Sequence, residues 1–435
     1  MPLKVLIIGA GVCGPAMALL LRRSDPEHSV TVVERYPGIR HNGLQIDLRG
    51  WGVPIVKRLG LMDAIREIVV KEKGTAFVDS KGGICGTFGV SESGSGKQSM
   101  TSEFEVMRGD LVQLLYEASL KDPKTGVRDP EVEYDPKSED QPGVRYRFGI
   151  HPTTLMQDDD GVDVTFSDGS TGRYDLVLGA DGQWSKTRRM IFGEEAALAM
   201  FKRLNMYTAY YTIPMEPQDD DMAQFYLAGE GRSIAMRSAD KRATQVYLML
   251  RTASEEVQQN VEHQPAEKQK AMFEKIFRGA GWQTERFLKG MWESKDFYAE
   301  SIGQVKAPHV VKGRVGLLGD AAYCAAPVTG MGTTVSLTGA WVLAGELVRH
   351  KGDVKTALEA YDVNVRPYID VAHQLLPGVP WLMTLESKWA VFIFQLFVRF
   401  LSTFKIDKLL FALLPEDRAG LGVPEYPELN IPATS

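Results

Sequence analysis

Cysteine is scarce in this sequence, with 3 residues in 435. Cys13, Cys85 and Cys324 are odd in number and have no metal-ligand spacing, so neither a disulfide framework nor a zinc site is indicated. A block of basic residues is also missing. The 50 basic and 56 acidic residues give a formal charge of −6, which makes nucleic acid an unexpected partner. No charged segment precedes the first apolar strand, so no signal peptide is visible and a cytoplasmic location is favoured.

Long uninterrupted apolar runs are missing as well. The most apolar stretch covers residues 379–415, and Lys388, Gln395, Arg399 and Lys405 interrupt it. No clean run of about twenty apolar residues remains, so a membrane-spanning helix is not expected. Apolar residues make up 44% of the chain and charged residues 24%, which is typical of a folded globular protein. A length of 435 residues favours two structural domains.

The N-terminal residues have the pattern of a dinucleotide-binding unit. LKVLII, at residues 3–8, is a continuous apolar run typical of a central parallel strand. GAGVCG follows, with Gly9 for a tight turn, Gly11 for close approach to a pyrophosphate and Gly14 for contact between helix and strand. Ala10 lies in the same loop, which leads to the helix N-terminus where the phosphates would rest.

A carboxylate follows the second predicted strand, SVTVV at residues 29–33. Glu34 lies 20 residues beyond Gly14, where an acidic side chain can accept hydrogen bonds from both hydroxyls of an adenosine ribose. Arg35 comes next and joins the predicted cofactor-binding set. A surface charge is the alternative interpretation of Glu34, and its position at a strand end argues against that alternative.

Two later strands end in the same way. YDLVLGA at residues 174–180 runs into Asp181, and GRVGLLG at residues 313–319 runs into Asp320. Acidic groups at the ends of separate strands predict one extended ligand along the carboxyl edge of a sheet. Asp320 can accept a hydrogen bond from a ligand hydroxyl, with a helix or turn cap as the alternative role.

A loop of small residues comes next. Pro327 precedes Gly330 and Gly332, whose lack of a side chain would let the backbone approach a flat ring. Thr333 joins Pro327, Gly330 and Gly332 in the predicted cofactor-binding set, and Thr333, or Thr334 beside it, is expected to cap the helix that follows. The positive end of that helix would then favour negative charge on the ring.

A second mononucleotide half does not follow the first, as it would in a nicotinamide dehydrogenase. Hairpin strands are predicted at residues 74–90 instead, followed by the Gly- and Ser-rich loop SESGSGKQSM. A strand and an amphipathic helix come next, in FEVMRGDLVQLLYEAS. The nucleotide-binding unit is therefore predicted to be discontinuous, and a nicotinamide dehydrogenase is the less favoured alternative.

Four segments carry a resemblance to a known family. They are GAGVCG with Glu34, VMRGDL with Arg108, GADGQWSKTR with Asp181 and Arg188, and GRVGLLGDAA with Asp320. The chain resembles the class A FAD-dependent monooxygenases of the para-hydroxybenzoate hydroxylase type. Within that family, GDAAY and TGMGTT are similar to a branch of tetracycline-inactivating enzymes and natural-product tailoring hydroxylases.

The resemblance implies an α/β fold. A Rossmann-like FAD-binding domain of the discontinuous GR2 type would hold an inserted α+β substrate domain, built on an antiparallel sheet, and would be followed by a C-terminal helical segment. Residues 1–75, 101–188 and 305–352 are assigned to FAD binding, and residues 76–100 and 189–304 to the substrate domain. Residues 353–435 are expected to form helices that bridge the domains or cover the substrate site, with an interfacial membrane helix as the alternative.

The resemblance also implies roles and chemistry. Arg108 would contact FAD, Asp320 would hold its ribitol, and residues 327–332 would lie against the isoalloxazine. NADPH or NADH would be a transient reductant, and an FAD C4a-hydroperoxide would hydroxylate an aromatic or polyketide-like substrate in secondary metabolism or xenobiotic inactivation. The chemistry would then be the flavin's, with no catalytic side chain and no metal. An FAD-dependent oxidase or dehydrogenase of the same fold and a membrane-peripheral flavin-binding protein are the alternatives.

Two positions depart from the family pattern. Tyr323 stands where many relatives have histidine, and SLTGA at residues 336–340 replaces the usual acidic residue of the following helix. Packing is the favoured role of Tyr323.

Alternating stretches between residues 190 and 303 predict an antiparallel sheet that roofs the flavin. Its candidate substrate residues are Tyr207, Tyr211, Tyr226 and Met236, with Arg237 as a candidate carboxylate anchor. Burial in the sheet core is the favoured alternative for each of them singly. An apolar or aromatic small molecule bound by shape suits this composition, and a monomer or homodimer is expected.

Overall fold

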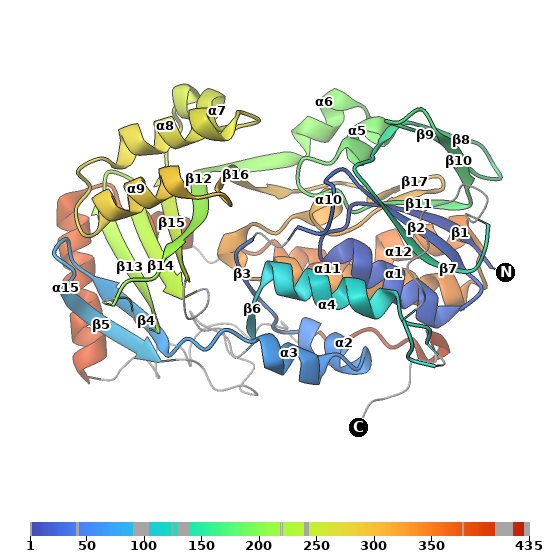
Figure 1. Ribbon diagram of the computed structural model, residues 1–435, viewed down its shortest axis with the longest axis horizontal. Coiled ribbons are helices and arrows are strands. Elements are labelled where there is room, and N and C mark those ends of the chain that lie inside the picture. The colour runs from blue at the N-terminus through green and yellow to red at the C-terminus, as the bar shows by residue number, and fades with distance from the viewer. Residues whose placement is uncertain are drawn as a thin grey trace.

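The structure is a computed structural model that describes residues 2–40, 43–89, 104–123, 125–128, 140–217, 219, 221–238, 243–375, 378–404 and 421–429. Two sheet-centred domains lie side by side along the long axis of the molecule (Figure 1). The α/β fold predicted from the sequence is confirmed.

A six-stranded sheet forms the core of the first domain. Its order is β17-β18-β11-β1-β2-β7, and all strands but β17 run parallel to their neighbours. The strands are β1 (Lys4–Ile8), β2 (Ser29–Glu34), β7 (Gly143–Phe148), β11 (Leu176–Gly179), β17 (Val311–Lys312) and β18 (Val315–Leu317). Side chains of β1 and β11 are buried on both faces, which explains their continuous apolar sequence. Three separate stretches of the chain therefore build one sheet.

Helices cover this sheet and link it to smaller elements. Helix α1 (Cys13–Ser24) packs against α4 (Arg108–Ser119) and α11 (Gly332–Arg349). The other elements around the first domain are α2 (Gly52–Arg58), α3 (Met62–Ile68), α5 (Lys186–Phe192), α6 (Glu194–Ala199), α10 (Asp320–Tyr323), η2 (Pro327–Thr329), the β3 (Gln45–Asp47) and β6 (Glu105–Met107) pair, and the three-stranded sheet of β8 (Pro152–Gln157), β9 (Val162–Phe166) and β10 (Thr171–Tyr174).

A seven-stranded sheet forms the second domain, in the order β16-β12-β15-β14-β13-β4-β5. The strands are β4 (Gly74–Val78), β5 (Ile84–Gly89), β12 (Phe201–Pro214), β13 (Met222–Gly229), β14 (Arg232–Ser238), β15 (Ala243–Arg251) and β16 (Tyr298–Val305). Helices α7 (Glu255–Val261), α8 (Ala266–Phe277) and α9 (Thr284–Glu293) lie on one face of it (Figure 1). Strand β4 begins two residues before the domain boundary predicted at residue 76.

The C-terminal segment crosses between the domains. Helices α12 (Val354–Asn364) and α13 (Arg366–Ala372) pack on α11, whereas α15 (Lys388–Phe404), after the short α14 (Val379–Leu382), packs on β5 and β13. Residues 421–429, which include η3 (Pro427–Leu429), return to the first domain. Tyr426 donates a hydrogen bond to Glu346 at 2.7 Å, and the Trp341 indole donates to the Pro424 carbonyl at 2.9 Å.

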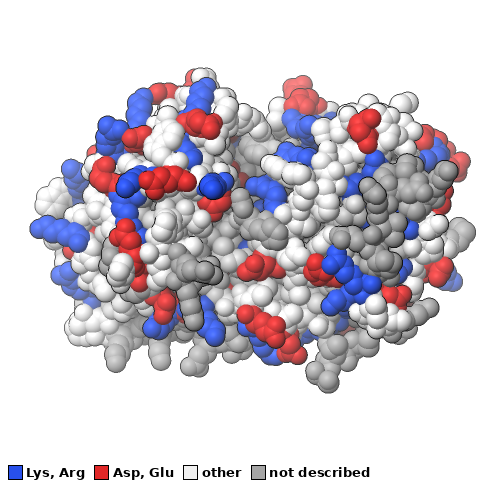
Figure 2. Space-filling view, viewed as in Figure 1, with Lys and Arg blue, Asp and Glu red and all other residues white. Residues whose placement is uncertain are grey.

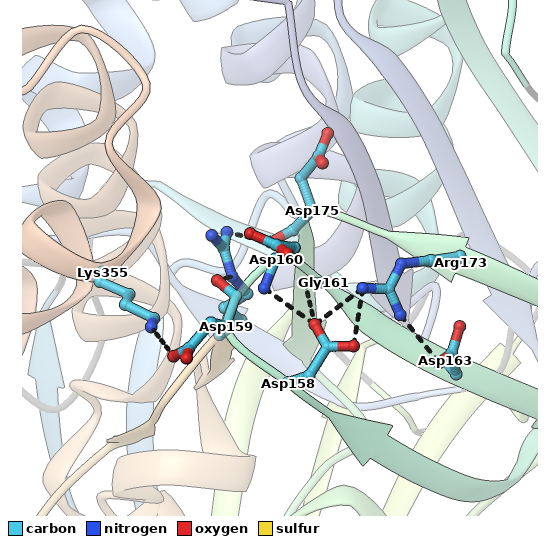
Figure 3. Close-up of polar contacts among 9 residues, drawn as sticks. Asp158, Asp159, Asp160, Gly161, Asp163, Arg173, Asp175 and Lys355 are labelled. Carbon is cyan, nitrogen blue, oxygen red and sulfur yellow. Dashed lines mark hydrogen bonds and ion pairs between the residues drawn. The ribbon is translucent and has the colours of Figure 1, made fainter.

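Charges are mixed on the surface. Basic and acidic side chains are interspersed over the face shown in Figure 2, without the basic stripe typical of a nucleic-acid site. The acidic turn at residues 158–160, between β8 and β9, is used for internal ion pairs (Figure 3). Arg173 bonds Asp158 and holds the pKa of that carboxyl well below its usual range, and Lys355 of α12 bonds Asp159 at 2.6 Å. No group of three or more metal-ligating side chains occurs in the described residues.

Candidate functional site

The carboxyl ends of four neighbouring parallel strands lie along one edge of the first sheet. In the order β18, β11, β1 and β2, these strands end at or just before Asp320, Asp181, Gly9 and Glu34. The chain stays paired beyond the strands, since the Ala180 N–H donates to the Ile8 carbonyl at 2.8 Å. In open α/β sheets, ligands bind at this kind of edge.

The glycine loop after β1 is built without room for side chains. Gly9 has a φ of +109°, and a Cβ there would overlap the carbonyl oxygen of Ala180. A Cβ at Gly14 would overlap the carbonyl oxygen of Gly9, so this glycine lets α1 lie directly on the loop. A Cβ at Gly11 would meet only Arg108, at 3.5 Å. The space in front of Gly11 therefore suits a ligand phosphate near the N-terminus of α1.

Glu34 holds the glycine loop and remains partly exposed. One carboxylate oxygen accepts a hydrogen bond from the Ala10 N–H at 2.9 Å, and the other accepts from the Tyr36 N–H at 3.0 Å. Each carboxylate oxygen can accept a further bond, which leaves capacity for ribose hydroxyls. Arg35 is exposed, and its guanidinium stacks over the Tyr36 ring at 4.9 Å. Arg35 therefore lies on the surface beside Glu34, at the carboxyl end of β2.

Asp181 serves its own loop. It accepts hydrogen bonds from the Ser185 hydroxyl at 2.5 Å and from the Thr187 N–H at 3.0 Å, which fixes the start of α5. Arg188 is 2% exposed and donates to the carbonyls of Gln183 and Ala321, both at 2.7 Å. Arg188 therefore ties the end of β11 to α10, and the family segment that contains both residues stabilises the edge by internal bonds.

Asp320 and Arg108 lie close enough to influence each other. The surrounding protein removes part of the solvation of the Asp320 carboxyl and raises its pKa, and the Arg108 guanidinium offsets part of that rise. The Asp320 side chain nevertheless stays solvent-accessible, so its oxygens are open to a ligand. Arg108 also lies against Gly43, where a Cβ would come within 3.0 Å of the Arg108 side chain. The two charged groups thus flank the carboxyl end of the sheet.

The loop of residues 327–332 follows the predicted course, except at its threonines. Pro327 begins the single turn η2, Gly330 adopts a φ of +63°, and Gly332 begins α11. No side chain caps α11, because the Thr334 hydroxyl donates to the Arg49 carbonyl at 2.8 Å. The prediction that Thr333 or Thr334 caps this helix is therefore wrong. Thr333 is partly exposed in the first turn of α11.

Tyr323 points away from the edge into the core. It is 1% exposed, and its hydroxyl lies 3.2 Å from the hydroxyl of Tyr361, which donates to the Leu317 carbonyl at 2.9 Å. A Cβ at Gly339 of α11 would overlap the Tyr323 hydroxyl. The two departures from the family pattern are thus one packing arrangement, since the glycine of SLTGA makes room for the tyrosine.

Four of the predicted substrate residues lie on the helix-covered face of the second sheet. Tyr207, Tyr211, Tyr226 and Met236 belong to the core between the sheet and helices α8 and α9. The Tyr211 hydroxyl donates to the Phe287 carbonyl at 3.0 Å, and the Tyr226 hydroxyl donates to the Ala280 carbonyl at 2.7 Å. Successive side chains of a strand alternate between faces, so the neighbouring residues face the other way. These four are core residues, as the favoured alternative for each of them predicted, and this corrects their assignment to the substrate face.

The opposite face carries a row of side chains in register across six strands. The aromatic row comprises Tyr298, Tyr210, Tyr247, Ala235, Phe225 and Phe77, from β16, β12, β15, β14, β13 and β4. The rings of Tyr210 and Tyr298 lie 5.0 Å apart, and those of Tyr210 and Tyr247 lie 5.4 Å apart. Ala235 is the one small side chain in the row. The sequence-based prediction missed this row because it assigned the alternate residues of these strands, which face the helices, to the substrate side.

Arg237 lies on the same face as the aromatic row and is already paired. It forms ion pairs with Glu72, at 2.6 Å, and with Glu105. Loss of solvation raises the pKa of Glu105 to about 8, and Arg237 counteracts that rise. The candidate anchor for a substrate carboxylate thus has two protein carboxylates as its partners.

Glu300 is a further residue that sequence reasoning missed. It lies on β16 opposite Thr208 of β12, two residues beyond Tyr298 and therefore on the same face. The Gln183 amide, from the loop after β11, donates to it at 2.8 Å. Loss of solvation and then the Asp320 charge raise the pKa of Glu300 to about 7, and Arg108 and Arg40 oppose the rise. A titratable carboxyl thus lies where the aromatic row meets the edge of the first sheet.

Glu300 gives a testable pH dependence. Its pKa of about 7 exceeds the usual 4.5, so the folded state holds this proton more tightly than the unfolded state. Its contribution to stability is complete below pH 4.5 and is lost as the pH rises through 7. A Glu300→Gln variant should therefore lose less unfolding free energy than wild type between pH 5 and pH 8, by on the order of 2 kcal/mol.

Urea unfolding of the apoprotein at pH 5 and pH 8 measures this difference. Glu293→Gln, at an exposed position of α9, is the matched control and should follow wild type. Equal pH dependence in Glu300→Gln and wild type would contradict the assigned environment of Glu300.

The edge as a whole fits an FAD molecule. The glycine loop and the N-terminus of α1 suit the pyrophosphate, and the partly exposed Glu34 suits the adenosine ribose. At the other end, Asp320 is accessible to a ribitol hydroxyl, and a Cβ at Gly332 would meet no atom within 4 Å. The donor set therefore matches the groups of this cofactor along its length.

Comparisons with known proteins agree with this geometry. Residues 2–373 match the family model described as "FAD binding domain". The FAD-dependent monooxygenase asL6 of Sarocladium schorii is 41% identical over 437 residues and covers 100% of both chains. The flavin-dependent monooxygenase eupH of Phoma sp is 35% identical, with 98% of each chain covered. The crystal structure of the tetracycline destructase Tet(51) has a TM-score of 0.73 and 27% identity, covering 95% of this chain and 99% of its own.

The chain belongs to the class A flavoprotein monooxygenases. It is an FAD-dependent monooxygenase, with FAD as its cofactor and NAD(P)H as the reductant typical of the family. No helix in the described part of the chain is long and apolar enough to cross a membrane.

Proposed function

We propose that this monooxygenase uses NAD(P)H and O2 to hydroxylate an aromatic or polyketide-like small molecule in natural-product biosynthesis. The aromatic row carries this proposal, because it places a run of rings on the sheet face that meets the FAD edge at Glu300. Offset and edge-on ring contacts favour a flat, electron-rich ligand. The similarity to asL6 and eupH supports the monooxygenase reaction. The similarity to a tetracycline destructase supports a substrate with fused rings.

The roles of this chain's residues toward FAD follow from their positions. Gly11 would leave room for the pyrophosphate in the loop that Gly9 and Gly14 shape by packing, Glu34 would bind the ribose, and Asp320 would hold the ribitol. Bound FAD supplies the activation of oxygen once a nicotinamide has reduced it. Arg108 contributes a positive charge and Glu300 a titratable carboxyl at the end of the sheet edge where the isoalloxazine would lie. The aromatic row would orient the substrate and exclude water from the reacting atoms.

Isotope labelling tests the proposal. Purified protein with FAD, NADPH and a screen of phenolic and polyketide compounds under ¹⁸O2 should give a product that is heavier by one labelled oxygen atom. Substrate-stimulated NADPH oxidation identifies the compound, and mass spectrometry locates the label. Oxidation of a compound with release of hydrogen peroxide and no incorporated label would identify an oxidase or dehydrogenase instead.

The aromatic row predicts which tyrosines affect substrate binding. Tyr298→Leu removes a ring from the row and should raise KM for the substrate roughly five- to tenfold, while bound FAD stays unchanged. Tyr226→Leu makes the same substitution on the helix-covered face and should lower Tm without changing KM. Steady-state kinetics and flavin absorbance measure both effects. Equal KM effects in the two variants would show that the row does not contact the substrate.

A further inference from the structure

Helix α15 carries an unusual concentration of exposed apolar side chains. Among the described residues, 16 large hydrophobic side chains are exposed, and 9 of them lie in α14 and α15 or just beside them, so this surface is not the scatter expected of a soluble protein. They are Trp381, Leu382, Trp389, Phe392, Ile393, Leu396, Phe397, Phe400 and Phe404. We call this set the α15 face.

The α15 face is held outward by packing on the other side of the helix. Val398 and Leu401 are buried against Cys85 and Phe88 of β5. A Cβ at Gly86 would come within 2.8 Å of Val398, so the helix lies directly on the backbone of this edge strand. The Ser402 hydroxyl accepts a hydrogen bond from the Thr87 N–H at 3.1 Å. Rotation of the helix to bury the α15 face would break these contacts.

The composition of the α15 face favours a lipid surface as its occupant. Six of its nine side chains are tryptophan or phenylalanine, which are typical of the face that an interfacial helix buries at the boundary between headgroups and acyl chains. The 17 residues of the helix that the structure describes are fewer than the roughly 20 needed to span the hydrocarbon core, which suits a position in the interfacial plane.

The charges of α15 complement an anionic membrane. Lys388 and Arg399 are its two charged residues, both basic and both exposed. Asp79, at the turn after β4, faces Arg399 and offsets part of that charge, whereas Lys388 lies at the opposite end of the helix. Basic residues beside an apolar helix face strengthen binding to anionic lipids.

We propose that α15 docks this protein on the surface of an anionic membrane, with its Trp and Phe side chains inserted among the lipid headgroups. The helix lies at the outer edge of the second domain, far from α1 and α4 (Figure 1). The helix also covers Phe77, the last residue of the aromatic row. The ring centroids of Phe394 and Phe77 are 5.2 Å apart, and Val398 lies over Gly86, which is paired with Phe77 in the sheet. A membrane-docked α15 would therefore place the row beside the lipid.

Vesicle binding by the full chain with FAD bound tests the proposal. Wild type should co-sediment with phosphatidylcholine vesicles that contain 30% phosphatidylserine, and less with pure phosphatidylcholine. The combined variant Trp389→Ser, Phe397→Ser and Phe400→Ser should bind the anionic vesicles at least tenfold more weakly. The matched control is Met156→Ser with Val363→Ser, whose side chains are 71% and 68% exposed on the first domain, and it should bind as wild type does.

Two further measurements separate the outcomes. Brominated lipids should quench tryptophan fluorescence in wild type, and Trp389→Phe with Trp381→Phe should lose most of that quenching but keep the binding. Flavin absorbance and Tm show that each variant is folded. Binding that survives the triple substitution would overturn the proposal. A lack of vesicle binding by wild type would also overturn the proposal. Light scattering would then show whether two copies of the chain cover the α15 face or whether another part of the same chain does. None of these results depends on hydroxylase activity, so the proposal can fail without the proposed function.

Discussion

A Gly14→Ala variant is expected to lose both its FAD and much of its stability. A methyl group at this position would overlap the carbonyl oxygen of Gly9, which is backbone and cannot move aside without opening the loop. Forcing one methyl group into a fully packed site costs about 1–3 kcal/mol, and the displaced loop no longer offers its N–H groups to the pyrophosphate. Urea unfolding of the apoprotein and flavin absorbance after desalting measure the two losses.

Gly11→Ala is the matched control, because the same methyl group would meet only Arg108 at an ordinary contact distance of 3.5 Å. The apoprotein should therefore unfold within a few tenths of a kcal/mol of wild type, whereas the methyl group would occupy the place of a phosphate and weaken FAD binding at least tenfold. Equal destabilisation of the two apoproteins would disprove the assignment of Gly14 to packing of the loop and of Gly11 to contact with the ligand.

A Gly339→Ala variant is expected to unfold about 2–4 kcal/mol more easily than wild type. The added Cβ would overlap the Tyr323 hydroxyl, and that ring is fully buried between α11 and Tyr361. Either the tyrosine or the helix has to shift, and α11 begins at the Gly332 end of the predicted flavin loop. Bound FAD should therefore decrease along with Tm.

Tyr323→Phe provides the test of cause. Alone, it removes one hydroxyl bond and should cost about 1 kcal/mol, because Tyr361 keeps its bond to the Leu317 carbonyl. Combined with Gly339→Ala, it removes the closest overlapping atom and leaves only the ring carbon Cζ, at 2.8 Å, so the double variant should be at least about 1 kcal/mol more stable than the sum of the single effects predicts. Additive effects would show that the overlap is relieved elsewhere.

The position of the strand ends along one edge of the first sheet was predictable from the sequence because its signals are local. Gly9, Gly11, Gly14 and Glu34 stand at fixed distances from apolar strands, and Asp320 ends one of those strands. Parallel strands place such ends together without any knowledge of side-chain packing. The same reasoning could not show that Asp181 fixes the start of α5, because the bonds of Asp181 depend on how its loop closes.

The proposed substrate face was not predictable because the central part of β12 is buried on both of its faces. In β12, Tyr207 and Tyr210 are both aromatic and both buried, so the alternation of apolar residues does not show which of them faces the helices and which faces the other side of the sheet. The pairing of β12 with β16 also has a register shift between Arg203 and Met206, so residues before and after it cannot be assigned to faces by a single alternating pattern. Tyr323 and Gly339 were separately visible as departures from a family pattern, but only their contact shows that they form one arrangement.

The way the first sheet is assembled sets the order in which this protein can be made. Strand β1 pairs with β11, whose residues begin at Leu176, and β11 in turn pairs with β18 at Val315. The Trp51 indole finally bonds the carbonyl of Leu421 at 3.1 Å. The cofactor domain therefore cannot be completed on the ribosome until most of the chain has emerged, and pairings of such long sequence separation form slowly. The second domain, whose strands β12 to β16 are contiguous in sequence, can fold while the first domain waits for its last strand.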